Sequence, residues 1–268
     1  MKHGVLVALA LAVASVAPAY AQNPVPAAPP RAGVEFLSRF DFHVSMEHLV
    51  SEDPRYVWDA NFGGELDMID YGRGRATFVA NYQTVLGSEF RAFDPNQGNY
   101  TLEGSTSARL GALEAAGVFH HVSRHLSDRP KRFPIDWNMI GGRIGGSTAS
   151  GRTVLRGRAD VRGVIQKSYV DYRWEVETAG AARVELRPRV ALVSSGSFRL
   201  VGVDGSRDRG TQYAARGEGG VRLDGRGAAL ELFVAAERRL DPYQLEFSTA
   251  TWLAVGFRIS SPTSVRMP

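Results

Sequence analysis

The chain has 268 residues, of which 44% are apolar, 22% charged and 10% aromatic, with 29 Gly, 13 Pro and no Cys. This composition excludes a disulfide-stapled scaffold, a collagen-like repeat and a disordered polypeptide, and without Cys there is no thiolate zinc site and no cysteine nucleophile. Only three of the 32 basic residues are Lys, so Arg carries almost all of the formal net charge of +4. Because acidic residues are interleaved along the chain, we expect no nucleic-acid partner.

The first residues predict export. Lys2 and His3 precede an apolar run at 5–16, and Ala19-Tyr20-Ala21 forms a small-x-small cleavage site before Gln22. This pattern is typical of a cleaved secretory signal peptide, and the apolar run is shorter than the roughly 20 residues of a membrane-spanning helix. We therefore expect a signal peptide at 1–21, a Pro/Ala-rich segment at 22–33, a folded unit at 34–260 and a tail at 261–268.

From Val34 onward the sequence alternates between apolar and charged residues with a period of two. Between 153 and 162, for example, Leu155 and Val161 fall on one side of an extended chain, and Arg156 and Arg162 fall on the other. Successive side chains of a β-strand point to opposite faces, so each such segment predicts a strand with one apolar and one ionic face.

Turn residues divide the chain into twelve predicted strands. Short, Gly-rich connections follow the even-numbered strands, at 179–180 after the eighth for example, and longer, more polar connections follow most odd-numbered ones. The ninth segment contains Pro188 and could hide an extra turn, which leaves ten or fourteen strands as alternatives. The predicted strands are 34–48, 56–69, 75–86, 99–109, 112–125, 134–147, 151–163, 168–179, 182–203, 210–223, 227–239 and 248–260.

An even number of strands with short turns on one rim and long loops on the other is typical of bacterial outer-membrane barrels. In hydrocarbon every backbone N–H and C=O needs an internal partner, which a closed ladder of strands supplies. We therefore predict an all-β fold, a closed antiparallel up-and-down transmembrane β-barrel with a polar lumen, located in the cell outer membrane. A secreted β-sandwich and a water-soluble barrel are the alternatives.

The inward-facing charges have two interpretations. Oppositely charged columns on neighbouring strands can pair and rigidify the interior, or they can form a charged constriction that selects small ionic solutes. The residues expected to line such a pore are Arg156, Arg158, Arg162, Arg173, Glu175, Arg187 and Arg189.

A histidine cluster ends the fifth predicted strand, where the chain reaches the external rim. His121, Ser123 and His125 are spaced i, i+2, i+4, so they share a face with their Cα atoms about 6.5–7 Å apart in pairs. Asp136 and Asn138 return on the next strand and are expected beside Ser123 and His125. A hydroxyl, an imidazole and a carboxylate within reach of one another supply the nucleophile, general base and orienting group for acyl transfer.

Other interpretations of this cluster remain open. Imidazole and carboxylate also suit a divalent metal, and rim side chains can simply bond to one another and to the next loop. The alternation places Val118 and Val122 toward lipid and Ser123 toward the lumen. Because His120 makes either face polar, a shift of one residue would reverse this expectation.

The His121-x-Ser123 sequence resembles the His-x-Ser-Asn signature of the outer-membrane lipid A 3-O-deacylases, with Arg124 in place of the Asn. The resemblance implies Ser123 as the nucleophile and His121 as the base, on a site that opens toward lipid. The longer pattern His-x-Ser-x-His-Leu-x-Asp at 121–128, with Glu237-Arg-Arg and Trp252-Leu-x-Val-Gly-Phe-Arg, is similar to an uncharacterised outer-membrane protein family.

Two functions are therefore expected. The first is a narrow charged pore or a structural surface protein. The second is a hydrolase of lipid A or phospholipid acyl esters built on Ser123 and His121, with Asp136 or His125 as the orienting partner. Expected partners are outer-membrane lipids, small ionic solutes, and the periplasmic chaperones and barrel-assembly machinery during biogenesis. No Walker loop, dinucleotide-binding glycine motif or HExxH motif occurs, so we expect no cofactor and no metal.

Overall fold

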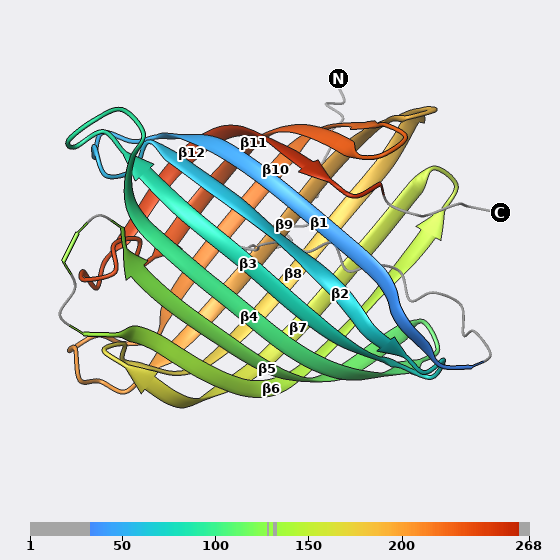
Figure 1. Cartoon of the computed structure of the whole chain (residues 1–268), viewed down its shortest axis with the longest axis horizontal. Coiled ribbons are helices and arrows are strands. Elements are labelled where there is room, and N and C mark those ends of the chain that lie inside the picture. Colours follow the sequence, from blue (N-terminus) through green and yellow to red (C-terminus); the bar gives the residue numbers. More distant parts are fainter. Residues whose placement is uncertain (1–32, 128, 131–132, 263–268) are drawn as a thin grey trace, which may run out of the picture.

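Twelve antiparallel strands close into one barrel in the computed structural model, which describes residues 33–127, 129–130 and 133–262 (Figure 1). Each strand pairs with its neighbours in the chain, and β1 pairs with β12 to close the ring. No helix among these residues is long and apolar enough to cross a membrane. The strands are β1 (Glu35–Val50), β2 (Trp58–Asp70), β3 (Arg75–Gly87), β4 (Asp94–Leu110), β5 (Leu113–Leu126), β6 (Ile135–Ser150), β7 (Thr153–Ser168), β8 (Tyr172–Arg187), β9 (Val190–Val203), β10 (Gln212–Asp224), β11 (Ala229–Leu240) and β12 (Thr249–Ser260).

The predicted fold class is confirmed, and the strand number is twelve. The predicted signal peptide at 1–21, the segment that follows it through residue 32, and the tail from residue 263 lie outside the described residues.

One predicted turn is wrong. Gly180 does not reverse the chain but lies within β8, where it pairs with Gly157 of β7 and Gly196 of β9. The reversal falls at Pro188 and Arg189, and Arg189 has a φ of 68°. Proline cannot donate to a ladder, which favours a strand end, whereas a glycine within a strand permits close approach or curvature. The long ninth segment therefore contained the true turn, and the count stayed at twelve.

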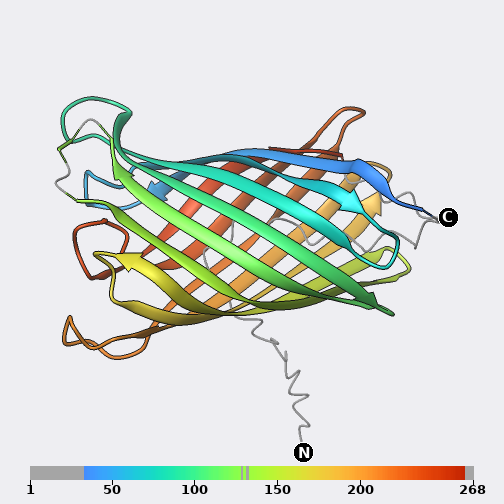
Figure 2. The same ribbon diagram turned by 60° about the horizontal axis from the view of Figure 1, so that its bottom comes forward.

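The two ends of the barrel differ. Short turns, at 111–112 and 188–189 for example, join strands at one end, and longer connections such as 204–211 and 241–248 join them at the other. Figures 1 and 2 show the longer loops gathered at the left end in both views. In outer-membrane barrels the short turns face the periplasm. We therefore call the short-turn end the periplasmic end and the long-loop end the outer end.

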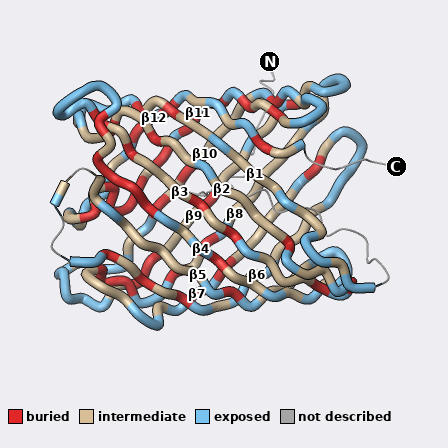
Figure 3. The backbone as a smooth tube through the Cα atoms, in the orientation of Figure 1, coloured by how far each residue is buried: buried red, intermediate tan, exposed pale blue. Residues whose placement is uncertain are grey.

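The wall is apolar outside and ionic inside. Large apolar side chains such as Phe40, Val161 and Leu253 are more than half exposed, whereas Asp160 and Arg162 are almost completely buried. Figure 3 shows buried segments running through strands that also carry exposed residues, as expected when successive residues face opposite sides. The predicted polar lumen is confirmed for these strands.

Val161, near the middle of β7, tests this polarity because its side chain is 60% exposed on the outer face. We expect Val161→Arg to lower the free energy of unfolding in lipid vesicles by about 2–4 kcal/mol, the cost of a lipid-facing arginine near the bilayer midplane. Urea titration followed by tryptophan fluorescence measures this change. An effect within about 0.5 kcal/mol, as on a water-exposed surface, would contradict the assignment of this face to lipid.

Candidate functional site

Ion pairs cross the lumen between strands that are not neighbours. Arg216 on β10 lies 2.7 Å from Glu47 on β1, Arg143 on β6 lies 2.7 Å from Glu103 on β4, and Arg239 on β11 lies 2.6 Å from Asp59 on β2. These arginine side chains reach past one or two intervening strands and so occupy the bore. Cavities of about 140, 90 and 50 Å³ lie among the side chains that face the lumen.

The outer end of the lumen holds an apolar cluster and a folded-in loop. Ile135, Trp137 and Tyr172 are buried in this cluster, and Leu245 of the β11–β12 loop packs against it. Trp137 thus lies inside the barrel and not on its lipid-facing side.

Arginines fix this loop to the barrel. Arg124 of β5 donates to the carbonyl oxygen of Asp241 at 2.7 Å, and Arg209 lies 2.8 Å from the Asp241 carboxylate. Although burial alone would lower it, hydrogen bonds to Asp171 and Asp241 raise the pKa of the loop residue Arg209 above its ordinary value. The loop is therefore held against the inner side of the wall behind β5.

The predicted pore-lining residues divide into two groups. Arg156, Arg158, Arg162 and Glu175 face the lumen, and Arg162 lies 2.7 Å from Glu175. The other group is exposed: Arg173 lies at a register irregularity at the start of β8, and Arg187 and Arg189 lie at the β8–β9 turn. Only the first group lies along the bore.

The expected orientation of the histidine strand is wrong. Val118 is buried, Val122 packs against the apolar cluster inside the lumen, and His120 lies 2.9 Å from the buried Glu103. The side chains between them, including Phe119 and Ser123, therefore point to the lipid-facing side. The lumen behind this part of β5 is partly apolar. Apolar side chains such as Val122 therefore face inward here, and the polar side chains of His121 and Ser123 face lipid.

On this outer face the structure brings together the predicted site residues of β5 and β6. Ser123 pairs with Asp136, and His121 pairs with Asn138 across the antiparallel ladder. Nδ1 of His121 lies 2.7 Å from Oδ1 of Asn138. An amide oxygen only accepts, so Nδ1 of His121 carries a hydrogen, and in the neutral ring Nε2 is then the nitrogen with the lone pair.

A hydrogen-bonded chain continues across β7. Asn138 donates from Nδ2 to Oε1 of Gln166, and Gln166 Nε2 lies 3.4 Å from a carboxylate oxygen of Asp136. Asp136 therefore does not contact His121 directly but lies at the far end of this chain. This series of hydrogen bonds, from His121 through Asn138 and Gln166 to Asp136, fixes the orientation of the His121 ring and of the two side-chain amides.

Ser123 bonds to the other histidine. Its Oγ lies 2.8 Å from Nε2 of His125, and the His125 ring packs edge-on against Tyr100 with 5.4 Å between centroids. Tyr100 lies on β4, where it pairs with Ser123 of β5, and its side chain is 46% exposed. The hydroxyl is thus flanked by one imidazole two residues before it and another two residues after it. We call His121, Ser123, His125, Asp136, Asn138 and Gln166 the wall cluster.

Sequence reasoning placed Asn138 near the site but gave it no role, and it missed Gln166. A signal for Gln166 exists only in three dimensions: the β6–β7 register shifts between Asn138 and Met139, which brings Gln166 opposite Asn138. Such bulges often re-aim a side chain beside a functional site.

The described part of the chain contains no group of three or more His, Cys, Asp or Glu residues placed to hold a metal ion.

Comparisons with known proteins place the fold. No family model matches the chain, and no curated protein matches it. Among solved structures, it is similar to the Salmonella typhi outer membrane phospholipase (OMPLA) dimer with bound calcium, with a TM-score of 0.52, 9% identity and coverage of 82% of this chain and 90% of that chain. It is also similar to outer membrane phospholipase A from Escherichia coli, with a TM-score of 0.52, 9% identity and coverage of 84% and 97%.

The closed barrel, its apolar outer wall and these neighbours define the class of protein. The chain has the fold of a bacterial outer-membrane β-barrel. The wall cluster lies near the outer ends of its strands, on the side that faces lipid.

Because the chain contains no Cys, single cysteines test which side each residue of β5 faces. In lipid vesicles, a bimane fluorophore on Ser123→Cys should be quenched strongly by nitroxide-labelled lipid, and one on Val122→Cys should be quenched weakly. Phe119→Cys and Val118→Cys provide the matched outward and inward controls. Stronger quenching at residue 122 than at residue 123 would place the wall cluster in the lumen.

Proposed function

We propose that this protein is an outer-membrane lipid acyl hydrolase with Ser123 as its nucleophile. The observation that carries the proposal is the wall cluster, a set of hydrogen-bonded polar side chains on a face that is otherwise apolar. Polar groups that face lipid are costly, and local departures from the pattern that stabilises a fold are expected at functional sites. A hydroxyl beside an imidazole of fixed tautomer is equipped for acyl transfer.

Each side chain has a distinct part in the reaction. Ser123 Oγ attacks the carbonyl carbon of the ester, and Nε2 of His121 accepts the proton as the tetrahedral intermediate forms. The imidazolium then protonates the leaving alcohol, and water, activated by the same nitrogen, releases the fatty acid from the acyl-enzyme. Asn138 holds the His121 ring in the tautomer that this requires, and Gln166 holds Asn138. His125 binds the hydroxyl of Ser123 in the resting state, and rotation about the Ser123 Cα–Cβ bond transfers it to His121.

The depth of the wall cluster suits a lipid ester. Tyr82 and Tyr100 lie beside it, with 4.7 Å between their ring centroids, and Phe62 extends the row at 5.2 Å from Tyr82. Aromatic girdles mark the boundary between hydrocarbon and headgroups, which is where acyl esters lie. Two of the similar solved structures are named as outer membrane phospholipases, and a lipid acyl ester is the substrate that we assign here.

The pore hypothesis has less support. The ion pairs between Arg216 and Glu47 and between Arg239 and Asp59 cross the bore, and the loop that carries Leu245 folds into its outer end. These features favour the interpretation of the lumen charges as interior packing.

The hydrolase is tested on phospholipid and lipid A in mixed micelles, with released fatty acid as the readout. We expect Ser123→Ala to lower kcat by at least about 10³-fold while the folded protein keeps its heat-modifiable migration on gels. His121→Ala should lower kcat comparably. Asn138→Ala removes one positioning hydrogen bond and should lower kcat by about tenfold.

His125→Ala is the matched control for the assignment of the base. It removes an imidazole at the same distance in sequence from Ser123 and should retain most of the activity. Loss of activity in His125→Ala with retention in His121→Ala would reverse the two roles. Unchanged lipid in the presence of the native protein would refute the hydrolase.

Planar-bilayer recordings address the pore directly. Because the lumen is crossed by ion pairs, we expect no stepwise conductance from the native protein. Reproducible steps whose ion selectivity changes in Arg156→Glu and Arg158→Glu would instead support the pore.

A further inference from the structure

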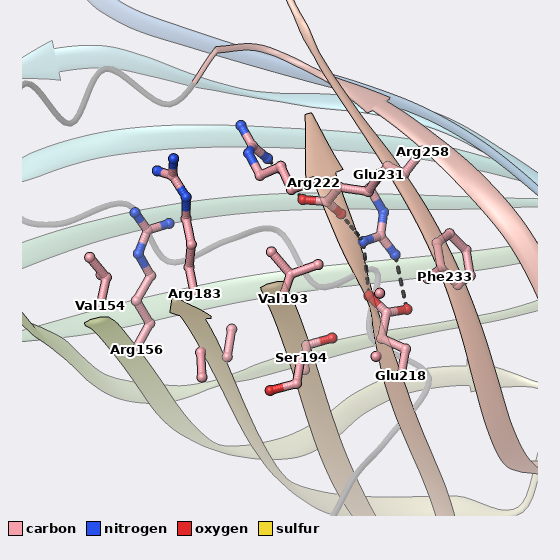
Figure 4. Close-up of a pocket in the computed structure, with 15 residues that line it drawn as sticks. Val154, Arg156, Arg183, Val193, Ser194, Glu218, Arg222, Glu231, Phe233 and Arg258 are labelled. Atoms are coloured by element: carbon pink, nitrogen blue, oxygen red, sulfur yellow. Dashed lines mark hydrogen bonds and ion pairs between the residues drawn. The ribbon is translucent and has the colours of Figure 1, made fainter. Parts of the chain in front are cut away.

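A second site lies at the opposite end of the barrel. Near the periplasmic end, a cavity of about 50 Å³ is lined by residues of the six strands from β7 to β12 (Figure 4). Its apolar walls include Val154, Val193 and Phe233. Four arginines and two glutamates also line it: Arg156, Arg183, Arg222, Arg258, Glu218 and Glu231.

Most of these charges are paired. Arg258 lies 2.8 Å from both Glu218 and Glu231, as the dashed lines of Figure 4 show in part. Arg183 lies 2.6 Å and Arg222 2.8 Å from the same carboxylate, that of Asp224. Arg222 also lies 2.8 Å from Glu231, so the carboxylates of Asp224, Glu218 and Glu231 are shared among Arg183, Arg222 and Arg258.

Arg156 is the exception. No hydrogen bond or ion pair joins it to any other residue in the described ranges, and its Nε atom is buried without a hydrogen-bond partner there. The positive charges of Arg222 and Arg183 act on it unfavourably. Asp41 attracts it but is itself paired with Arg39. A partly buried charge without a partner is costly unless a counter-ion satisfies it.

From this arrangement we infer that the cavity is a binding site for a small oxyanion, a phosphate or carboxylate group that enters from the periplasmic end. Arg156 supplies the uncompensated charge, and Arg183 stands beside it on the neighbouring strand, with both side chains extending to the same side in Figure 4. Guanidinium groups present several N–H donors in a planar fork, which matches the oxygens of such groups. The site is independent of the wall cluster, which lies at the other end of the barrel.

Calorimetric titration of the full-length folded protein in detergent micelles tests the site, with inorganic phosphate and acetate as probes at low ionic strength and neutral pH. We expect saturable binding of at least one of them, and Arg156→Gln should weaken it by about tenfold or more, the effect of losing one charge-assisted hydrogen bond. Arg156→Lys keeps the charge and should retain part of the affinity. Phosphate binding without acetate binding would identify a phosphate site, and binding of both would identify a general oxyanion site.

Arg187→Gln is the matched control, because Arg187 lies at the same end of the barrel but is exposed at the β8–β9 turn. Its affinity should equal that of the native protein. Heat-modifiable migration and circular dichroism confirm that each variant is folded. Failure of both probes to bind the native protein, or equal affinity in Arg156→Gln, would overturn the inference. Lipid hydrolysis should be unchanged in Arg156→Gln, so the two sites can fail separately.

Discussion

The strict alternation of side chains along a closed hydrogen-bonded ladder decides what each residue of this protein meets. Closure satisfies the backbone within hydrocarbon, and alternation then sends every second residue to the lipid and the rest to the bore. A one-residue shift exchanges the two faces of a strand. In β5 the alternation places His120 against Glu103 in the lumen, and it places His121 and Ser123 on the outer wall.

Much of the fold could be predicted because its cause is local. Alternation of apolar and ionic residues in β7, with Val161 outside and Arg162 inside, is readable from adjacent letters of the sequence. Turn positions are harder to predict, since a glycine can mark either a turn or a curved strand. Gly180 is the second case, and Pro188 with Arg189 forms the actual turn.

Only part of the candidate site could be predicted from the sequence. Its residue types and their spacing on β5 are visible in the sequence, but the side of the wall is not, because an apolar patch inside the lumen takes Val118 and Val122. The partner of His121 depends on the β5–β6 register, and that of Asn138 depends on a bulge in β7. Both are tertiary features. The pairing of Ser123 with His125 rather than His121 likewise depends on side-chain rotation.

The two ends of the barrel thus carry different chemistry. The outer end has a serine hydroxyl with two imidazoles on its lipid-facing side, and the periplasmic end has an excess of arginine in its lumen. Covalent labelling tests most directly whether the outer site is a reactive serine centre. A long-chain alkyl fluorophosphonate, added to the protein in vesicles and followed by mass spectrometry, should modify Ser123 alone. The adduct should be absent from a protein that lacks the His121 imidazole. No adduct at Ser123, or equal labelling of many exposed serines, would contradict the account.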